Sequence, residues 1–199
     1  MKIIATNITN LTDARYFASW GVHYLAYDID PNSENFTSQA QIKEISDWVE
    51  GPTSIITING LSVPATIDDI VQNLNIYHAI IGPFIEKSDL PNGIKTIFKS
   101  CIVDELNSLS DIRDQHLIIV LSSPIKKLTS DQIKSIADIS IRNSVYLDGI
   151  FTDKDLSIIQ DMKVEGIVVK GGDEEKVGIK TFDELDDLLN AFMEINWIA

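Results

Sequence analysis

Glycines follow two apolar runs near the end of the chain, where they could bind a phosphate group. Gly149 comes just after the seventh such run, and Lys170-Gly171-Gly172 comes just after the eighth. Glycine lets backbone N–H groups approach a phosphate closely, and a helix N-terminus adds further donors. In barrels of alternating strands and helices, the loops after the seventh and eighth strands commonly form a phosphate site. The alternative is that these glycines only make turns.

Metal and cofactor chemistry has little support in the sequence. The stretch that begins at Asp28 looks like the start of a calcium loop, but Ser33 stands in place of the required glycine. Gln39 stands where the loop needs a bidentate glutamate, so we exclude a calcium site. Cys101 is the only cysteine, which excludes an intramolecular disulfide and a cysteine metal cluster. We expect no metal and no cofactor.

Eight apolar runs of strand length recur along the chain, and each is nearly continuous rather than alternating. Continuous runs of this kind are typical of buried parallel strands. The runs are Lys2–Ala5, His23–Tyr27, Ser54–Ile58, Ile76–Ile81, Lys95–Phe98, Leu117–Leu121, Ser144–Leu147 and Gly166–Val169.

Helical patterns lie between these runs, and several begin with a residue that can cap a helix. Ser38, Thr129 and Thr181 each precede an apolar helical pattern, with Gln or Glu at the capping-box position three residues later. Thr152 heads another helix. The first helical pattern opens at Asp13, weaker patterns cover 63–74 and 103–112, and 82–92 is expected to be a loop.

Alternation of strands and helices predicts a parallel α/β architecture. Eight such units indicate a single (β/α)8 TIM barrel over residues 1–199, with short loops because this length is at the lower limit for the fold. The runner-up is an open, doubly wound sheet. In a barrel the three histidines, which stand mostly at strand starts, lie at the face away from the chemistry.

The charge balance excludes some classes of partner. The chain has 30 acidic and 16 basic residues and a net charge of −14, which argues against nucleic acid and against an anionic membrane surface. It suits a small-molecule ligand, and an anionic ligand would need locally placed donors. We find no signal sequence and no long apolar segment, so we expect a cytoplasmic protein. The sequence gives no oligomeric state.

Two segments resemble the phosphoribosylanthranilate isomerase family of tryptophan biosynthesis. Ile8–Ala14 resembles the family's ITN-x-x-DA segment, and Val169–Lys180 resembles its eighth-strand segment S-S-G-V-E-x-x-P-G-x-K. Asn59 resembles the asparagine that ends the third strand. The resemblance implies a (β/α)8 barrel, a phosphorylated substrate and an Amadori rearrangement of an aminoaldose to an aminoketose. A general acid opens the ribose ring, and a general base removes the C2 proton of the imine.

The sequence departs from the family at its catalytic positions. Thr6 stands where the family has the cysteine base, and Ser122 stands where it has the aspartate acid. Neither side chain titrates near neutral pH, so neither can replace the acid or the base. Asn35 aligns with the arginine that meets the anthranilate carboxylate. The resemblance also implies that Asn7 and Asn10 contact substrate or its phosphate.

Three interpretations remain open. The first is a working isomerase that uses other groups at the same mouth, with Asp28, Asp148 and Cys101 as candidates. The second is a family member with another phosphorylated substrate. The third is a noncatalytic barrel that binds a ligand or a protein partner.

Overall fold

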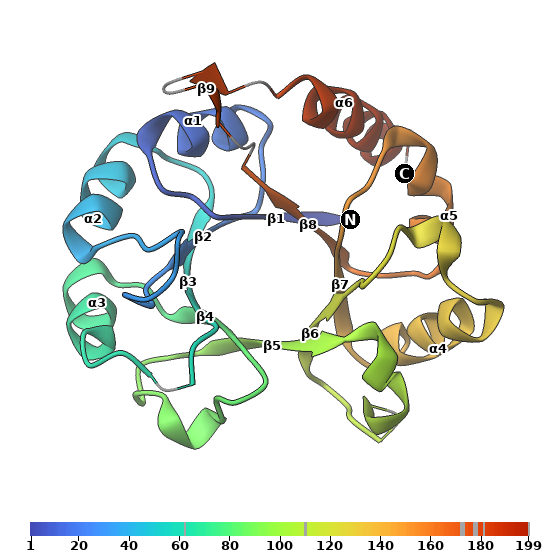
Figure 1. The fold of residues 1–199 in the computed structure, drawn as a ribbon, viewed down its shortest axis with the longest axis horizontal. Coiled ribbons are helices and arrows are strands. Elements are labelled where there is room, and N and C mark those ends of the chain that lie inside the picture. Colours follow the sequence, from blue (N-terminus) through green and yellow to red (C-terminus); the bar gives the residue numbers. More distant parts are fainter. Residues whose placement is uncertain (62, 110, 172–173, 177–178, 181, 199) are drawn as a thin grey trace.

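The strands form one closed parallel barrel, seen from its mouth in Figure 1. In this computed structural model, residues 1–199 are described except for 62, 110, 172–173, 177–178, 181 and 199. Each strand pairs with the next along the chain, and the eighth pairs with the first. The predicted (β/α)8 barrel is therefore confirmed. The strands are β1 (Lys2–Thr6), β2 (Tyr24–Asp28), β3 (Thr53–Ile58), β4 (His78–Ile81), β5 (Thr96–Ile102), β6 (His116–Val120), β7 (Ser144–Asp148) and β8 (Gly166–Lys170).

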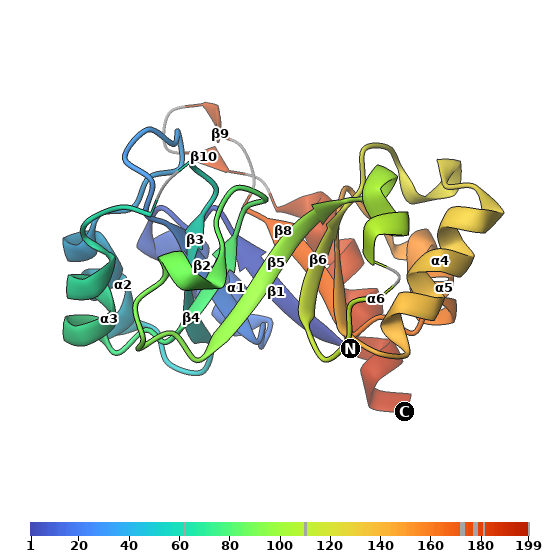
Figure 2. The same cartoon turned by 90° about the horizontal axis from the view of Figure 1, so that it is seen from below.

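An incomplete layer of helices surrounds the barrel (Figure 2). The connections after β4 and β5 carry only 3₁₀ turns in their described residues, which is how eight units fit into so short a chain. The α-helices are α1 (Leu11–Ser19), α2 (Gln39–Trp48), α3 (Ile67–Leu74), α4 (Ser130–Ser140), α5 (Leu156–Asp161) and α6 (Asp183–Ile198). The 3₁₀ turns are η1 (Lys87–Asp89), η2 (Val103–Leu109), η3 (Ile125–Lys127) and η4 (Asp153–Asp155). A small hairpin, β9 (Glu174–Lys176) and β10 (Ile179–Lys180), precedes α6.

Two of the four helix starts predicted from capping residues are found as expected. Ser38 and Thr129 each form a capping box with the glutamine three residues later, at the starts of α2 and α4. The first helix begins earlier than expected, at Leu11, because the Asn10 side chain accepts a hydrogen bond from the Asp13 N–H at 2.9 Å. Such a cap satisfies a donor that the helix itself leaves free.

Two predicted starts have other outcomes. Thr152 forms a capping box with Asp155, but the box begins the 3₁₀ turn η4, and α5 follows from Leu156. Thr181 lies outside the described residues, and α6 begins at Asp183. The weak pattern over 103–112 is a 3₁₀ turn rather than an α-helix.

Apolar side chains fill the part of the barrel interior nearest the amino ends of the strands. The ring centroids of Tyr24 and Tyr146 each lie 5.6 Å from that of Phe98. Gly166 makes room for this packing, because a Cβ there would lie 2.0 Å from the Lys2 carbonyl oxygen and 2.9 Å from Cε1 of Tyr146. The buried residues of this inner core are Ile4, Ala26, Ile55, Ile80, Phe98, Ile118, Tyr146 and Val168. The barrel interior is thus filled with apolar side chains toward the amino ends of the strands.

The histidines lie at the amino ends of the strands, as predicted. His78 and His116 begin β4 and β6, and burial lowers the pKa of both imidazoles. His23 precedes β2 and accepts a hydrogen bond from the Ile3 N–H at 3.3 Å. All three are therefore far along the strands from the open mouth. None of the helices in the described part of the chain is long and apolar enough to cross a membrane.

Candidate functional site

The carboxyl ends of the strands enclose a cavity of about 250 Å³, which we call the polar cavity. Side chains alternate along each strand, so the last inward-facing residue of each strand reaches the same space. Most of the lining residues carry a carboxylate, ammonium, amide or hydroxyl group. The lining residues are Thr6, Asn7, Asp28, Thr57, Asn59, Ile80, Ser100, Ile118, Val120, Asp148, Val168 and Lys170.

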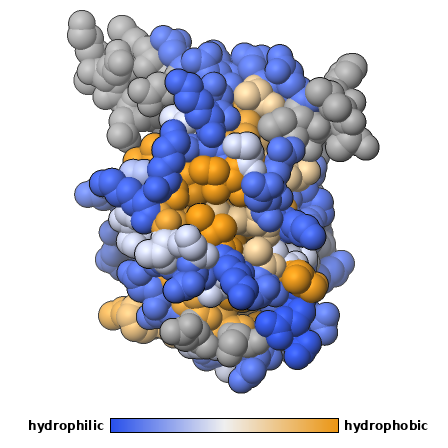
Figure 3. Space-filling view, turned by 90° about the vertical axis from the view of Figure 1, so that its right-hand side faces the viewer, coloured by the Kyte–Doolittle hydropathy of each residue, from blue (hydrophilic) through white to orange (hydrophobic). Residues whose placement is uncertain are grey.

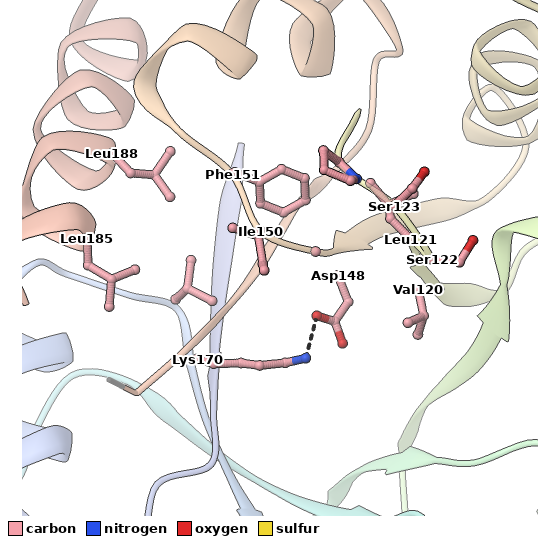
Figure 4. A pocket seen from close by; sticks show the side chains of 13 residues that line it. Val120, Leu121, Ser122, Ser123, Asp148, Ile150, Phe151, Lys170, Leu185 and Leu188 are labelled. Carbon is pink, nitrogen blue, oxygen red and sulfur yellow. Dashed lines mark ion pairs between the residues drawn. The ribbon is translucent and has the colours of Figure 1, made fainter. Parts of the chain in front are cut away.

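An ion pair stands at the wall of the polar cavity formed by β7 and β8. Nζ of Lys170 lies 3.2 Å from Oδ1 of Asp148, and Figure 4 shows the two side chains meeting. The Asp148 side chain is only 16% exposed, whereas that of Lys170 is 55% exposed. In such a pair the mostly buried carboxylate can accept a proton from a bound ligand, and the partly exposed ammonium group can donate one.

Asp28 lines the same cavity from β2, but its carboxylate already has partners. Oδ1 accepts a hydrogen bond from the Asp30 N–H at 3.0 Å, and Oδ2 accepts one from the Ser33 hydroxyl at 2.7 Å. These bonds fold the loop between β2 and α2. Asp28 therefore has a structural role that Asp148 does not share.

Hydroxyl groups complete the polar cavity. The Thr6 hydroxyl donates to the Val169 carbonyl at 3.3 Å, and Thr6 pairs with Lys170 in the barrel register. Thr57 is 8% exposed, and its hydroxyl has no hydrogen-bond partner among the described residues. A buried polar group without a partner is costly, and a bound ligand or water would relieve that cost.

A second cavity, of about 440 Å³, adjoins the first, and we call it the apolar chamber. It lies between the segments that follow β6 and β7 and the first half of α6 (Figure 4). On this side of the molecule, hydrophobic residues gather in the middle of the face and hydrophilic ones frame them (Figure 3). The described lining residues are Val120, Leu121, Ser122, Ser123, Pro124, Asp148, Gly149, Ile150, Phe151, Val169, Lys170, Leu185 and Leu188.

The predicted phosphate-binding glycines lie at different places around these cavities. Gly149 lines the apolar chamber, where a Cβ would lie 3.2 Å from Cζ of Phe151 and 3.3 Å from Cβ of Leu121. The Gly171 N–H donates to the Thr6 carbonyl at 3.3 Å, and a Cβ at Gly171 would lie 3.3 Å from Oδ2 of Asp13. Gly172 lies outside the described residues.

The asparagines expected to contact substrate also lie in different parts of the structure. Asn7 lines the polar cavity, and its φ of 59° is left-handed. Asn10 caps α1 and donates through Nδ2 to Oδ2 of Asp13 at 3.0 Å. Asn35 belongs to the loop after β2, where its N–H donates to the Ser33 hydroxyl at 3.2 Å. Among these asparagines, only Asn7 belongs to the described lining of either cavity.

Cys101 faces outward from β5 and packs in the outer core between the barrel and its surrounding layer. Burial raises the pKa of its thiol, so the reactive thiolate is disfavoured. The neighbouring Ser100 faces inward and lines the polar cavity. Cys101 therefore packs as a small, buried apolar side chain.

The end of β6 brings a residue into the site that the sequence did not single out. β6 ends at Val120, which lines both cavities, whereas Ser122 lines only the apolar chamber. Thr57 and Ser100 are further lining residues that were missed. The signal that could have found them is alternation, counted back from the true end of each strand. Among the described residues, no group of three or more His, Cys, Asp or Glu side chains could hold a metal ion.

Comparison with known proteins identifies the fold. No protein-family model matches the sequence, and no curated protein matches it. The phosphoribosyl anthranilate isomerase of Thermus thermophilus superposes with a TM-score of 0.77 at 16% identity, over 98% of this chain and 100% of that one. The isomerase of Thermotoga maritima gives a TM-score of 0.77 at 16% identity, over 98% of this chain and 99% of that one.

A ligand complex is among the similar structures. It is a phosphoribosyl anthranilate isomerase bound to reduced 1-(o-carboxyphenylamino)-1-deoxyribulose 5-phosphate, with a TM-score of 0.69 at 17% identity, over 98% of this chain and 99% of that one. The resemblance seen in the sequence is thus confirmed for the fold, which is shared from end to end.

Proposed function

We propose that this chain is a divergent phosphoribosylanthranilate isomerase-like enzyme that isomerises a phosphorylated aminoaldose to the aminoketose. The observation that carries the proposal is the Asp148–Lys170 ion pair in the polar cavity. The shared fold supports it, as does the phosphorylated compound bound to one similar structure.

Asp148 is the proposed general base. In an Amadori rearrangement, the ring oxygen gains a proton as its bond to C1 breaks, and an imine forms. A base then removes the C2 proton, and the resulting enolamine becomes the ketone when C1 gains a proton and the C2 hydroxyl loses its own. Asp148 takes the C2 proton, and the Lys170 ammonium group gives a proton to the ring oxygen. Thr6 and Ser122 cannot take these roles, because a hydroxyl is a far weaker base than a carboxylate and a far weaker acid than an ammonium group.

The remaining lining groups are proposed to bind the ligand. Asn7, Thr57, Asn59 and Ser100 offer neutral groups for sugar and phosphate oxygens, and Lys170 adds a positive charge. Asp28 holds the loop after β2 and contributes a carboxylate to the cavity. The small, polar cavity suits a polyol rather than a flat apolar ligand.

The isomerase proposal predicts a specific loss on removal of the Asp148 carboxylate. Asp148→Asn should lower kcat for phosphoribosylanthranilate by about 10²–10⁴-fold, which is the usual contribution of one general acid–base group. Asp161→Asn, at an exposed position of α5, is the matched control and should keep full activity. Thermal unfolding of both variants checks that each is folded.

Two results would separate the alternatives. If the unaltered chain neither turns over phosphoribosylanthranilate above the uncatalysed rate nor complements a strain lacking the isomerase, the proposed activity is wrong. Binding of a product analogue without turnover would then support a noncatalytic barrel. The absence of cysteine and aspartate at the family's base and acid positions favours this alternative over other enzyme classes.

A further inference from the structure

The apolar chamber has the composition of a site for an uncharged group. Five of its described lining residues are large and apolar, and they come from three separate segments of the chain. They are Leu121, Ile150, Phe151, Leu185 and Leu188. Small-molecule sites are usually concave and mostly apolar, with a few polar groups that set orientation, and their volumes are about 300–1,000 Å³. The chamber, at about 440 Å³, lies within this range.

The loop after β7 and helix α6, which follows β8 in the chain, border this chamber. In barrels the loops after the seventh and eighth strands commonly hold phosphate. Here the described groups do not favour an anion. Gly149 is packed against Phe151 and Leu121, and the Gly171 N–H is already bonded to the Thr6 carbonyl. Lys170 is the single cationic residue in the described lining, and it is paired with Asp148. Among the described lining residues, an anion in this chamber would therefore find few hydrogen-bond donors and no unpaired positive charge.

We infer that the apolar chamber binds an uncharged aryl or aliphatic group of a small-molecule ligand, in the place where such barrels commonly bind phosphate. An engineered cavity of about 150 Å³ is enough to bind benzene in another protein, so this larger chamber can hold a substituted ring. Its volume is too small for a helix or a folded partner.

The two cavities adjoin each other, which suggests how a single ligand could occupy both. Val120, Asp148 and Lys170 line both, so a ligand can place an apolar group in the chamber and a hydroxylated group in the polar cavity. The ion pair at the boundary would meet the bond that joins the two parts. This inference goes beyond the proposed activity, since the chamber can bind an apolar group whether or not the barrel is an isomerase.

The test uses 4-methylbenzyl alcohol, an uncharged arene, and inorganic phosphate as separate probes of the purified chain. Carbon-13 methyl NMR follows the lining residues Ile150, Leu185 and Leu188. The arene should shift these signals saturably, and excess inorganic phosphate should neither shift them nor displace the arene. Leu185→Asp should weaken arene binding by about tenfold or more, because it places a charge in the apolar wall.

Two further variants keep the test decisive. Ile150→Asp is expected to weaken binding as well, and it should fold because Ile150 is 86% exposed. Leu61→Asp is the matched control, since Leu61 is also exposed but belongs to neither cavity's described lining, and it should bind the arene normally. No saturable shift, binding unaffected by both chamber variants, or displacement by phosphate would each overturn the inference. Because no sugar phosphate is present, failure of the isomerase proposal would not change these readings.

Discussion

At the scale of single residues, the last inward-facing position of each strand decides what chemistry the mouth can do. β6 ends at Val120, which pairs with Asp148 of β7 in the barrel register. The resemblance places an acid at the end of the sixth strand, and this structure has an apolar side chain there. Ser122, two residues later, lines the neighbouring chamber instead. Counting from the end of the strand therefore points to Val120 for the missing acid, whereas the sequence spacing pointed to Ser122.

This difference predicts which substitution restores a catalytic pair. Thr6→Cys combined with Val120→Asp should raise isomerase turnover by about 10²-fold or more if both groups act. An aspartate beside Asp148 would share its site, and like charges raise the pKa of one of two neighbouring carboxyls, which keeps that carboxyl protonated as an acid. The measurement is kcat/KM for phosphoribosylanthranilate.

The comparison variant is Thr6→Cys combined with Ser122→Asp, which should give no gain. A gain from the Ser122 pair alone would show that the acid position follows the sequence spacing rather than the strand end. If neither folded double variant gains activity, the cavity has diverged in more than these two groups.

At the scale of elements, one ion pair joins the turns that follow β6 and β7 behind the apolar chamber. Nζ of Lys126 in η3 lies 3.2 Å from Oδ1 of Asp155 in η4, and the Asp155 side chain is 7% exposed. Asp155 also accepts hydrogen bonds from the Thr152 N–H at 2.9 Å and the Thr152 hydroxyl at 2.8 Å. These contacts hold the two turns together and so help to shape the chamber.

The same contacts predict a pH dependence of stability. Burial by itself raises the pKa of the Asp155 carboxyl, but the bonds from Thr152 and the Lys126 ammonium outweigh burial and lower the pKa below its ordinary 3.8. A carboxyl whose folded pKa is lowered stabilises the fold above its unfolded pKa and loses that contribution as the pH falls. Asp155→Asn should therefore reduce the free energy of unfolding by about 1–2 kcal/mol at pH 7. The deficit should shrink below about pH 3.8, as measured by urea unfolding.

Lys43 and Asp47 form an exposed i, i+4 pair on α2 that serves as the control. Asp47→Asn should change the unfolding free energy by less than about 0.5 kcal/mol, because solvent screens an exposed pair. A deficit in Asp155→Asn that stays constant down to pH 3 would mean that the charge of Asp155 contributes nothing.

At the scale of the whole molecule, the net charge of −14 opposes any anionic ligand. Local charge does not reverse this field, since Asp28 and Asp148 outnumber Lys170 among the described lining of the polar cavity. The barrel therefore has to bind a phosphorylated ligand against long-range repulsion. Salt screens such repulsion, because the Debye length falls from about 30 Å at 0.01 M to about 8 Å at 0.15 M.

The affinity for a phosphorylated ligand should therefore rise by a small factor between 0.01 M and 0.15 M salt. A strongly cationic phosphate site would show the opposite trend. Calorimetric titration with a product analogue at several salt concentrations measures this dependence, and the uncharged 4-methylbenzyl alcohol is the control whose affinity should stay unchanged. A steep fall in affinity with salt would show that the site presents more positive charge than the described residues do.

The sequence by itself determined the architecture, because the signals for it are local. Continuous apolar runs and the capping residues Ser38 and Thr129 depend on neighbours within a few positions. Eight alternating units leave few ways to bury the strands, so the closed barrel followed from the pattern. The family resemblance likewise rested on contiguous segments, such as Ile8–Ala14.

Only the tertiary structure decided what surrounds the mouth. A strand end misplaced by one or two residues changes which side chain points inward, and that shift separates Val120 from Ser122. Whether a glycine N–H is free depends on a distant partner, as for Gly171 and the Thr6 carbonyl. The apolar chamber forms where segments around 121, 150 and 185 meet. Its composition is set by contacts between residues far apart in the chain, which no local pattern encodes.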